Sequence, residues 1–284
     1  MRRFGRPLGW AAVVLVVLGA WADGIGASSP RDCRRRLCDE GSVVGEAFTR
    51  ADVEMELRVG REVAARILGR FGLLPDERLQ RYVNRVGALL ARNASRPELV
   101  YRFGVLDTGT ANAFSTPGGY VFLTRGAVEA MESEAELAAV LAHEIAHVDR
   151  RHVVRDLGIR APEGGLEGGV ARLVGAGGGA VQVAFRQAVE GTLAILFQRG
   201  YRVEQESEAD QVALMILAHT GYRPQALGRY LERLQSKRKA RTGRFIRTHP
   251  MAPDRLKAIW HAFPKGRPIG VELRTRFERY VSSR

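Results

Sequence analysis

The sequence has few cysteines and no long uninterrupted apolar segment. It contains two cysteines, Cys33 and Cys38, which is too few for a disulfide-stapled secreted scaffold. Whether the two pair with each other stays open, and no further cysteine or histidine lies near enough in sequence to form a metal site with them. The N-terminal apolar stretch, Leu8 to Trp21, is 14 residues long, shorter than the roughly 20 that a membrane-spanning helix needs.

Acidic residues are also scarce relative to basic ones. The chain has 31 Asp and Glu against 44 Lys and Arg, a net charge of +13, and basic proteins often bind polyanions. The densest basic cluster, residues 237–247, lacks interleaved aromatic residues, so we do not expect nucleic acid binding. Attraction to an anionic membrane surface and an ordinary solvated helix surface both explain this cluster.

The N-terminus has the features of an export signal. Arg2, Arg3 and Arg6 precede the apolar stretch, and Ala20-Trp21-Ala22 resembles a cleavage site. We predict a signal peptide over residues 1–22, a flexible basic lead segment over 23–41 and a single domain over 42–284. The alternative is an uncleaved signal anchor.

The segment His143-Glu144-Ile145-Ala146-His147 carries the clearest chemical signal. Residues four apart share one face of a helix, so both imidazoles are able to bind one zinc ion. Ser133 and Glu136 form a capping-box pattern before an apolar-periodic run, which predicts that helix. Glu144 is then placed as general base for a zinc-bound water. The alternative interpretation is two solvated histidines on a surface helix.

A catalytic zinc ion usually takes a third protein ligand. A second helical pattern, opening at Tyr201, is dense in carboxylates, among them Glu204, Glu206 and Glu208. Taken alone, such an acidic face is more often simply solvated.

Four sequence blocks together resemble a known family. They are HExxH from His143, ExxxD from Glu206 to Asp210, the segment Asn112 to Leu123, and Thr248-His249-Pro250 with Arg255. This order is similar to that of the HtpX-, BepA- and Oma1-like gluzincin metallopeptidases, which are related to the CAAX prenyl protease. The resemblance implies that Glu206 is the third ligand of one Zn²⁺ and that Asp210 orients a ligating imidazole.

The resemblance also implies how substrate binds. Tyr120 to Leu123 is expected to form an exposed edge strand that pairs with an extended peptide. The expected substrate-contacting residues are Asn112, Gly119, Tyr120, Val121 and Phe122. An ordinary loop leading into a strand explains the same Pro and Gly residues.

Two further histidines have alternative roles. The family places His249 close to the metal, where it either donates to the oxyanion of the transition state or occupies the open zinc position as a gate. A loop histidine without catalytic function is the other interpretation. We expect His152 to cap or pack at the end of the metal helix rather than bind metal.

The remaining patterns predict an α+β, mainly helical zincin with a small sheet. Helices are expected near Val43 to Phe71 and Pro75 to Arg92, with a strand near Val100 to Leu106. The Gly-rich tract at 164–179 lacks phosphate-loop spacing, which argues against nucleotide binding. The apolar run that follows it to Phe197 is interrupted by charges and predicts an amphipathic helix.

The motifs and the predicted signal peptide together predict an exported, periplasmic metalloendopeptidase that acts on polypeptides. The family resemblance implies misfolded or stalled envelope proteins as its substrates. A zinc-dependent chaperone or assembly factor with a rarely used or gated site is one alternative, and a polyanion- or membrane-surface-binding protein is another. The oligomeric state stays open.

Overall fold

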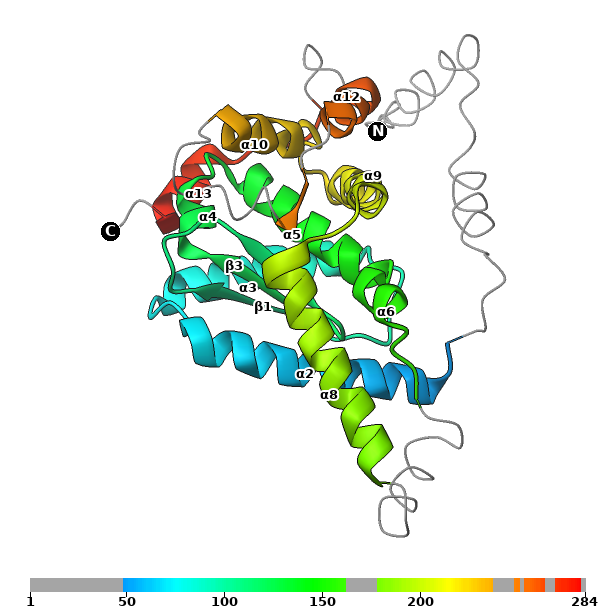
Figure 1. Cartoon of the computed structure of the whole chain (residues 1–284). Helices are drawn as coiled ribbons and strands as arrows, with labels where there is room; N and C mark the ends of the chain where they lie inside the picture. Colours follow the sequence, from blue (N-terminus) through cyan, green and yellow to red (C-terminus); the bar gives the residue numbers. More distant parts are fainter. Residues whose placement is uncertain (1–47, 162–177, 237–247, 251–252, 264–268, 282–284) are drawn as a thin grey trace, which may run out of the picture. The chain divides into compact units, whose positions relative to one another are not determined.

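The computed structural model describes residues 48–161, 178–236, 248–250, 253–263 and 269–281 (Figure 1). The predicted signal peptide and lead segment, both cysteines and the 237–247 basic cluster lie outside these ranges. The described part consists mainly of helices with one small sheet, so the predicted fold class is confirmed. Within it, no helix combines the length and the apolar character needed to cross a membrane.

The sheet has three strands, β1 (Arg102–Leu106), β2 (Ala113–Thr116) and β3 (Tyr120–Thr124). Their order is β1-β3-β2, with β1 parallel and β2 antiparallel to β3. The prediction of an exposed edge strand at Tyr120 to Leu123 is therefore wrong, because β3 is the central strand and pairs on both sides. The tight turn at Gly118 and Gly119, both at positive φ, folds β3 back against β2 and leaves β2 at the edge.

Helix α3 (Glu77–Ala91) covers the other edge of the sheet. The Gln80 side chain donates to the Val105 carbonyl and accepts from the Val105 N–H, both at 2.9 Å. Asn84 donates to the Phe103 carbonyl at 2.7 Å. These side-chain amides form hydrogen bonds with the outer backbone groups of β1, which an edge strand otherwise leaves unpaired. Strand β2 is the other edge of the sheet.

Helix α5 (Glu134–Asp149) lies at the centre of the described part, and every one of its residues is buried. Ser133 caps it, accepting a hydrogen bond from the Glu136 N–H at 3.3 Å. The capping box is only half formed, since the Glu136 carboxylate accepts from the Glu132 N–H instead. The predicted helix is confirmed, and its HExxH residues are inside the protein rather than on a solvated face.

The remaining helices surround α5 and the sheet. Helix α2 (Arg50–Phe71) packs against α8 (Gly178–Ala194), and α9 (Val203–Thr220) packs along α5. Apolar residues of α3, β3, α5 and α9 share one core, and those of α2, α8 and the following π-helix form a second. The other elements are α4 (Arg125–Glu129), α6 (His152–Leu157), η1 (Ile195–Arg199), α10 (Gln225–Ser236), α12 (Pro253–Ala262) and α13 (Arg274–Val281).

Candidate metal centre

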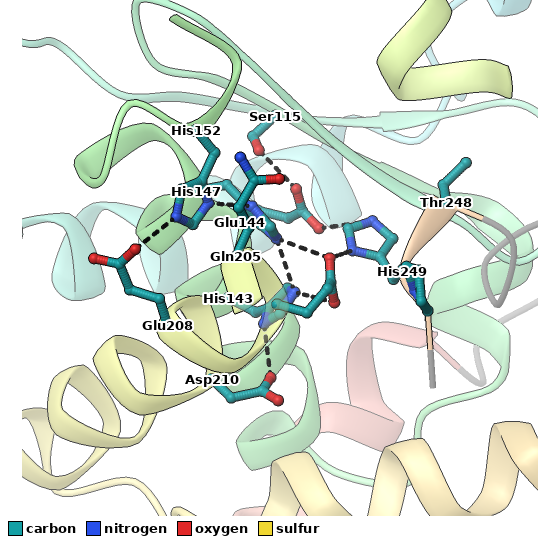
Figure 2. Close-up of polar contacts among 12 residues, drawn as sticks. Ser115, His143, Glu144, His147, His152, Gln205, Glu208, Asp210, Thr248 and His249 are labelled. Carbon is teal, nitrogen blue, oxygen red and sulfur yellow. Dashed lines mark hydrogen bonds and ion pairs between the residues drawn. The ribbon is translucent and has the colours of Figure 1, made fainter. Parts of the chain in front are cut away.

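The cluster that the structure assembles contains His143, His147, Glu206 and His249, all buried. Helix α5 supplies both imidazoles from successive turns, α9 supplies the carboxylate, and the segment 248–250 supplies the fourth side chain. Their candidate ligand atoms all lie within 4.8 Å of one another. Figure 2 shows the side chains of α5, α9 and the 248–250 segment converging on this point.

The geometry fits a bound cation. The Nε2 atoms of His143 and His147 face each other at 3.1 Å, and both approach the Glu206 carboxylate, at 3.4 and 3.3 Å. Without a cation, this contact requires a hydrogen on one of the two nitrogens; with a cation between them, both nitrogens are able to act as ligands. Two imidazole nitrogens and one carboxylate oxygen form a donor set that zinc accepts in catalytic sites.

Electrostatics hold Glu206 in its charged form. Burial alone raises the pKa of a carboxyl group, but His249, Arg255 and His143 outweigh that effect and lower the pKa of Glu206 well below its ordinary value. Arg255 contacts Glu206 Oε2 through Nη1 at 2.6 Å. The site therefore presents a carboxylate anion, the form that binds a metal.

The two imidazoles differ in their surroundings. Burial lowers the pKa of His147 well below 6.5, which favours the neutral ring that a metal ligand requires. Burial acts in the same direction on His143, but the carboxylates of Glu206 and Asp210 outweigh it and raise the pKa of that ring. Asp210 Oδ1 lies 3.0 Å from His143 Nδ1, so the Nε2 atom of His143 is the one turned toward the cluster.

Asp210 is itself fixed by Arg255. The guanidinium donates from Nε and Nη2 to the two Asp210 oxygens, at 2.7 and 2.9 Å, and from Nη1 to the Pro250 carbonyl at 2.7 Å. Arg255 is almost completely buried. The sequence block that contains Arg255 indicated the family but did not predict that Arg255 contacts Asp210. Through these contacts Arg255 joins α12 to α9 and to the His249 segment.

Glu144 lies next to the two imidazoles but turns its carboxylate toward the sheet. Ser115 on β2 donates to Glu144 Oε2 at 2.8 Å. Among the described residues, Glu144 Oε1 has no hydrogen-bond partner, although His249 Nε2 lies 3.5 Å away. Ser115 was within the predicted Asn112 to Leu123 block, yet no spacing in the sequence distinguished it from its neighbours.

His249 is held against the cluster through its neighbour Thr248. The Thr248 hydroxyl lies 3.3 Å from Asn112 Oδ1, and the Thr248 carbonyl accepts from the Tyr201 N–H at 3.0 Å. His249 Nδ1 is 3.0 Å from Glu206 Oε1. Asn112 is buried and its amide oxygen also accepts from the Ala113 N–H, whereas its amide nitrogen has no hydrogen-bond partner among the described residues.

Two aromatic side chains pack on His147. Tyr201 stacks on the ring with centroids 3.8 Å apart and planes 22° from parallel. His152 is the first residue of α6, after a turn in which Arg151 has positive φ, and its Nδ1 lies 2.8 Å from His147 Nδ1. It therefore packs as expected but contacts the cluster, which its position five residues after His147 did not predict.

The predicted site residues divide into three groups. The structure brings together Glu144, the four residues of the buried cluster and Asp210. Asn112 lies beside them through its contact with Thr248. Gly119 is in the β2–β3 turn, while Tyr120, Val121 and Phe122 belong to the central strand and do not form the edge that was predicted for them.

A buried HExxH helix and a glutamate from a second helix, in a mainly helical chain, are typical of the zincin-type metallopeptidases. The sequence model of peptidase family M48 matches residues 77–262, and the chain belongs to this family. The predicted family is thereby confirmed.

Named relatives agree with that assignment. The chain is 29% identical to the beta-barrel assembly-enhancing protease of Escherichia coli strain K12, over 92% of this chain and 54% of that protein. It is 26% identical to the mitochondrial metalloendopeptidase OMA1 of Schizosaccharomyces pombe, over 77% of this chain and 64% of that protein. The chain thus spans about half the length of the first of these relatives.

Proposed function

We propose that this chain is a zinc-dependent endopeptidase whose metal is held by His143, His147 and Glu206. The observation that carries the proposal is the buried convergence of these three side chains beside Glu144. When bound, zinc lowers the pKa of a coordinated water to about 7 and polarises a substrate carbonyl. The protein supplies the remaining steps.

Glu144 is the proposed general base. Ser115 holds its Oε2, so Oε1 is the atom that accepts a proton from the attacking water. The same oxygen then returns the proton to the leaving amine, since one positioned carboxylate is able to serve as base and acid in turn. Glu144 itself is fully buried.

Asp210 and His249 complete the proposed site. Asp210 fixes the ring orientation of His143, and Arg255 fixes Asp210. His249 has two proposed roles that the same position supports: its ring N–H stabilises the oxyanion of the transition state, or the ring occupies the fourth metal position until the 248–250 segment moves.

The proposed substrate-binding edge is β2. Hydrogen bonds in an antiparallel pair alternate along the strand, and the Asn112 carbonyl accepts from Thr124 of β3. The backbone groups of Ala113 and Ser115 therefore point away from β3, in agreement with the Ala113 N–H bonding the Asn112 side chain. An extended peptide adding to this edge would lie beside Glu144.

The proposed substrates are exported proteins that are misfolded or stalled in assembly. The predicted signal peptide supports export to the periplasm, and the name of the Escherichia coli relative supports β-barrel proteins as a substrate class. A chaperone without turnover is less favoured, because Glu144 and its Ser115 contact are both present.

The decisive test compares the wild-type mature chain with Glu144→Gln on casein and on an unfolded β-barrel protein. Loss of the general base should lower turnover by about 10²–10⁴-fold, with bound zinc unchanged because Glu144 is not a ligand. Glu204→Gln is the matched control, since Glu204 is an exposed residue at the start of α9.

Chelation should abolish wild-type cleavage, and added Zn²⁺ should restore it. Cleavage that persists in Glu144→Gln would contradict the proposed mechanism. Equal cleavage of folded and unfolded β-barrel protein would contradict the proposed substrate class.

A further inference from the structure

His147 lies at one end of a chain of polar contacts that leads from the metal cluster toward the protein surface. Its Nδ1 is 2.8 Å from His152 Nδ1, and His152 Nε2 is 3.2 Å from Glu208 Oε2. Both contacts are drawn in Figure 2. His152 is 2% exposed, whereas the Glu208 side chain is 39% exposed.

The hydrogen positions along this chain follow from the metal site. If His147 binds metal through Nε2, its neutral ring carries hydrogen on Nδ1 and donates it to His152 Nδ1. The His152 ring then accepts at Nδ1 and carries its own hydrogen on Nε2. That hydrogen is directed at the Glu208 carboxylate, so every donor in the chain has an acceptor.

Glu208 has a charged or polar neighbour at each of its oxygens. Oε2 contacts His152, and Oε1 lies 3.3 Å from Arg150 Nε in an ion pair that is not a hydrogen bond. Arg150 follows the last residue of α5, so α5 and α9 are joined through this carboxylate. Glu208 is thereby able to hold His152, and through it His147, in one orientation.

The two metal-ligating imidazoles thus have carboxylate partners on the same helix. Asp210 contacts the His143 Nδ1 atom directly at 3.0 Å. The Glu208 carboxylate is too far from His147 to do the same, and His152 fills the intervening space. Helix α9 then presents Glu206 to the metal, and the two orienting carboxylates, Glu208 and Asp210, follow it two and four residues later.

We propose that His152 and Glu208 are positioning residues that fix the tautomer and ring orientation of His147 for metal binding. The inference rests on the proposed metal site. A carboxylate behind a ligating imidazole raises the affinity of the site for its metal. Here the Glu208 carboxylate acts on His147 through the His152 ring.

The test measures Zn²⁺ affinity of the full mature chain by competition with a chromophoric chelator. His152→Ala should weaken zinc binding by about 10–100-fold. His152→Asn should recover part of that loss, because the Asn amide oxygen is able to accept from His147 Nδ1. If His152 only fills space, Asn and Ala would bind zinc equally, and that result would overturn the proposal.

Glu208→Gln tests the same series of contacts at its outer end. Because the Glu208 side chain is partly exposed, this substitution should affect folding less than one at His152. It should weaken zinc binding less than His152→Ala, since the Gln carbonyl still accepts from His152. Glu204→Gln, one turn earlier on α9 and exposed, is the control and should bind zinc as the wild type does.

The double variant His152→Ala, Glu208→Gln decides whether the two residues act together. If Glu208 acts on His147 only through His152, the double variant should bind zinc no more weakly than His152→Ala alone. Additive losses, or wild-type affinity in Glu208→Gln, would overturn the proposal. Absence of zinc binding by the wild type would overturn the proposed function as well, so the two failures are distinguishable.

Discussion

At the scale of the residue, similar carboxylates have different surroundings within this chain. Glu206 is buried among cationic groups and stays charged, Glu144 is buried with one oxygen on a hydroxyl, and Glu204 is exposed on the same helix as Glu206. Environment rather than residue type separates a proposed ligand, a proposed base and a solvated side chain.

Ser115→Ala tests how the proposed base is oriented. A hydrogen bond to a charged acceptor contributes about 1.5–3 kcal/mol. Its loss should therefore lower kcat by about 10- to 100-fold. Zinc content should not change, because Ser115 contacts no proposed ligand. The measurement is steady-state peptide hydrolysis together with metal analysis.

Ser236→Ala is the control for that substitution. Ser236 is exposed at the end of α10, where its hydroxyl donates to the Arg233 carbonyl. Its kcat should match the wild type. Undiminished kcat in Ser115→Ala would show that Glu144 does not depend on this contact.

At the scale of the element, helix α2 is pressed against the turn that joins β2 and β3. A Cβ atom on Gly60 would lie 1.6 Å from the Pro117 carbonyl oxygen, and the Thr116 hydroxyl donates to the Gly60 carbonyl at 3.4 Å. The buried Glu56–Arg96 ion pair reaches the same turn, since Glu56 accepts from the Gly118 N–H. The proposed substrate-binding edge is thus supported from α2.

Gly60→Ala should lower the free energy of unfolding by about 3 kcal/mol, because overpacking against backbone forces a shift of the helix or the turn. Gly69→Ala in the same helix is the matched control, since nothing lies within 4 Å of its added Cβ. It should raise stability by roughly 0.5–1 kcal/mol through helix propensity. Denaturant unfolding measures both. A stabilising Gly60→Ala would contradict the close approach of α2 to the turn.

At the scale of the whole molecule, the proposed metal joins two helices, α5 and α9, that are distant in sequence. His249 of the 248–250 segment lies in the same cluster. The unfolded chain does not hold these groups together, so a metal that binds only the folded protein adds its binding free energy to stability.

Chelation should therefore destabilise the fold. A ligand present at 1,000 times its Kd contributes about 4 kcal/mol. For a domain of this size, removing that contribution should lower Tm by roughly 10 °C. Calorimetry with and without chelator measures the shift, and added Zn²⁺ should reverse it. A Tm that does not respond to chelator would contradict a bound metal.

The sequence by itself determined the local features. Ser133 caps α5 as predicted, and the interval of four residues between His143 and His147 puts both rings on one helix face. The helical patterns of α3 and α9 were also predictable, because helix periodicity depends on neighbours within a few residues. The family order of motifs then linked Glu206, Asp210 and His249 to the HExxH helix.

Only the tertiary structure decided which distant side chains meet. The central position of β3, the Ser115–Glu144 contact, the stacking of Tyr201 on His147 and the contact of His152 with Glu208 each join separate segments. Strand order and long-range contacts depend on how helices and strands pack around one core. No local spacing or periodicity encodes that packing, and so the expected edge was assigned to β3 when β2 occupies it.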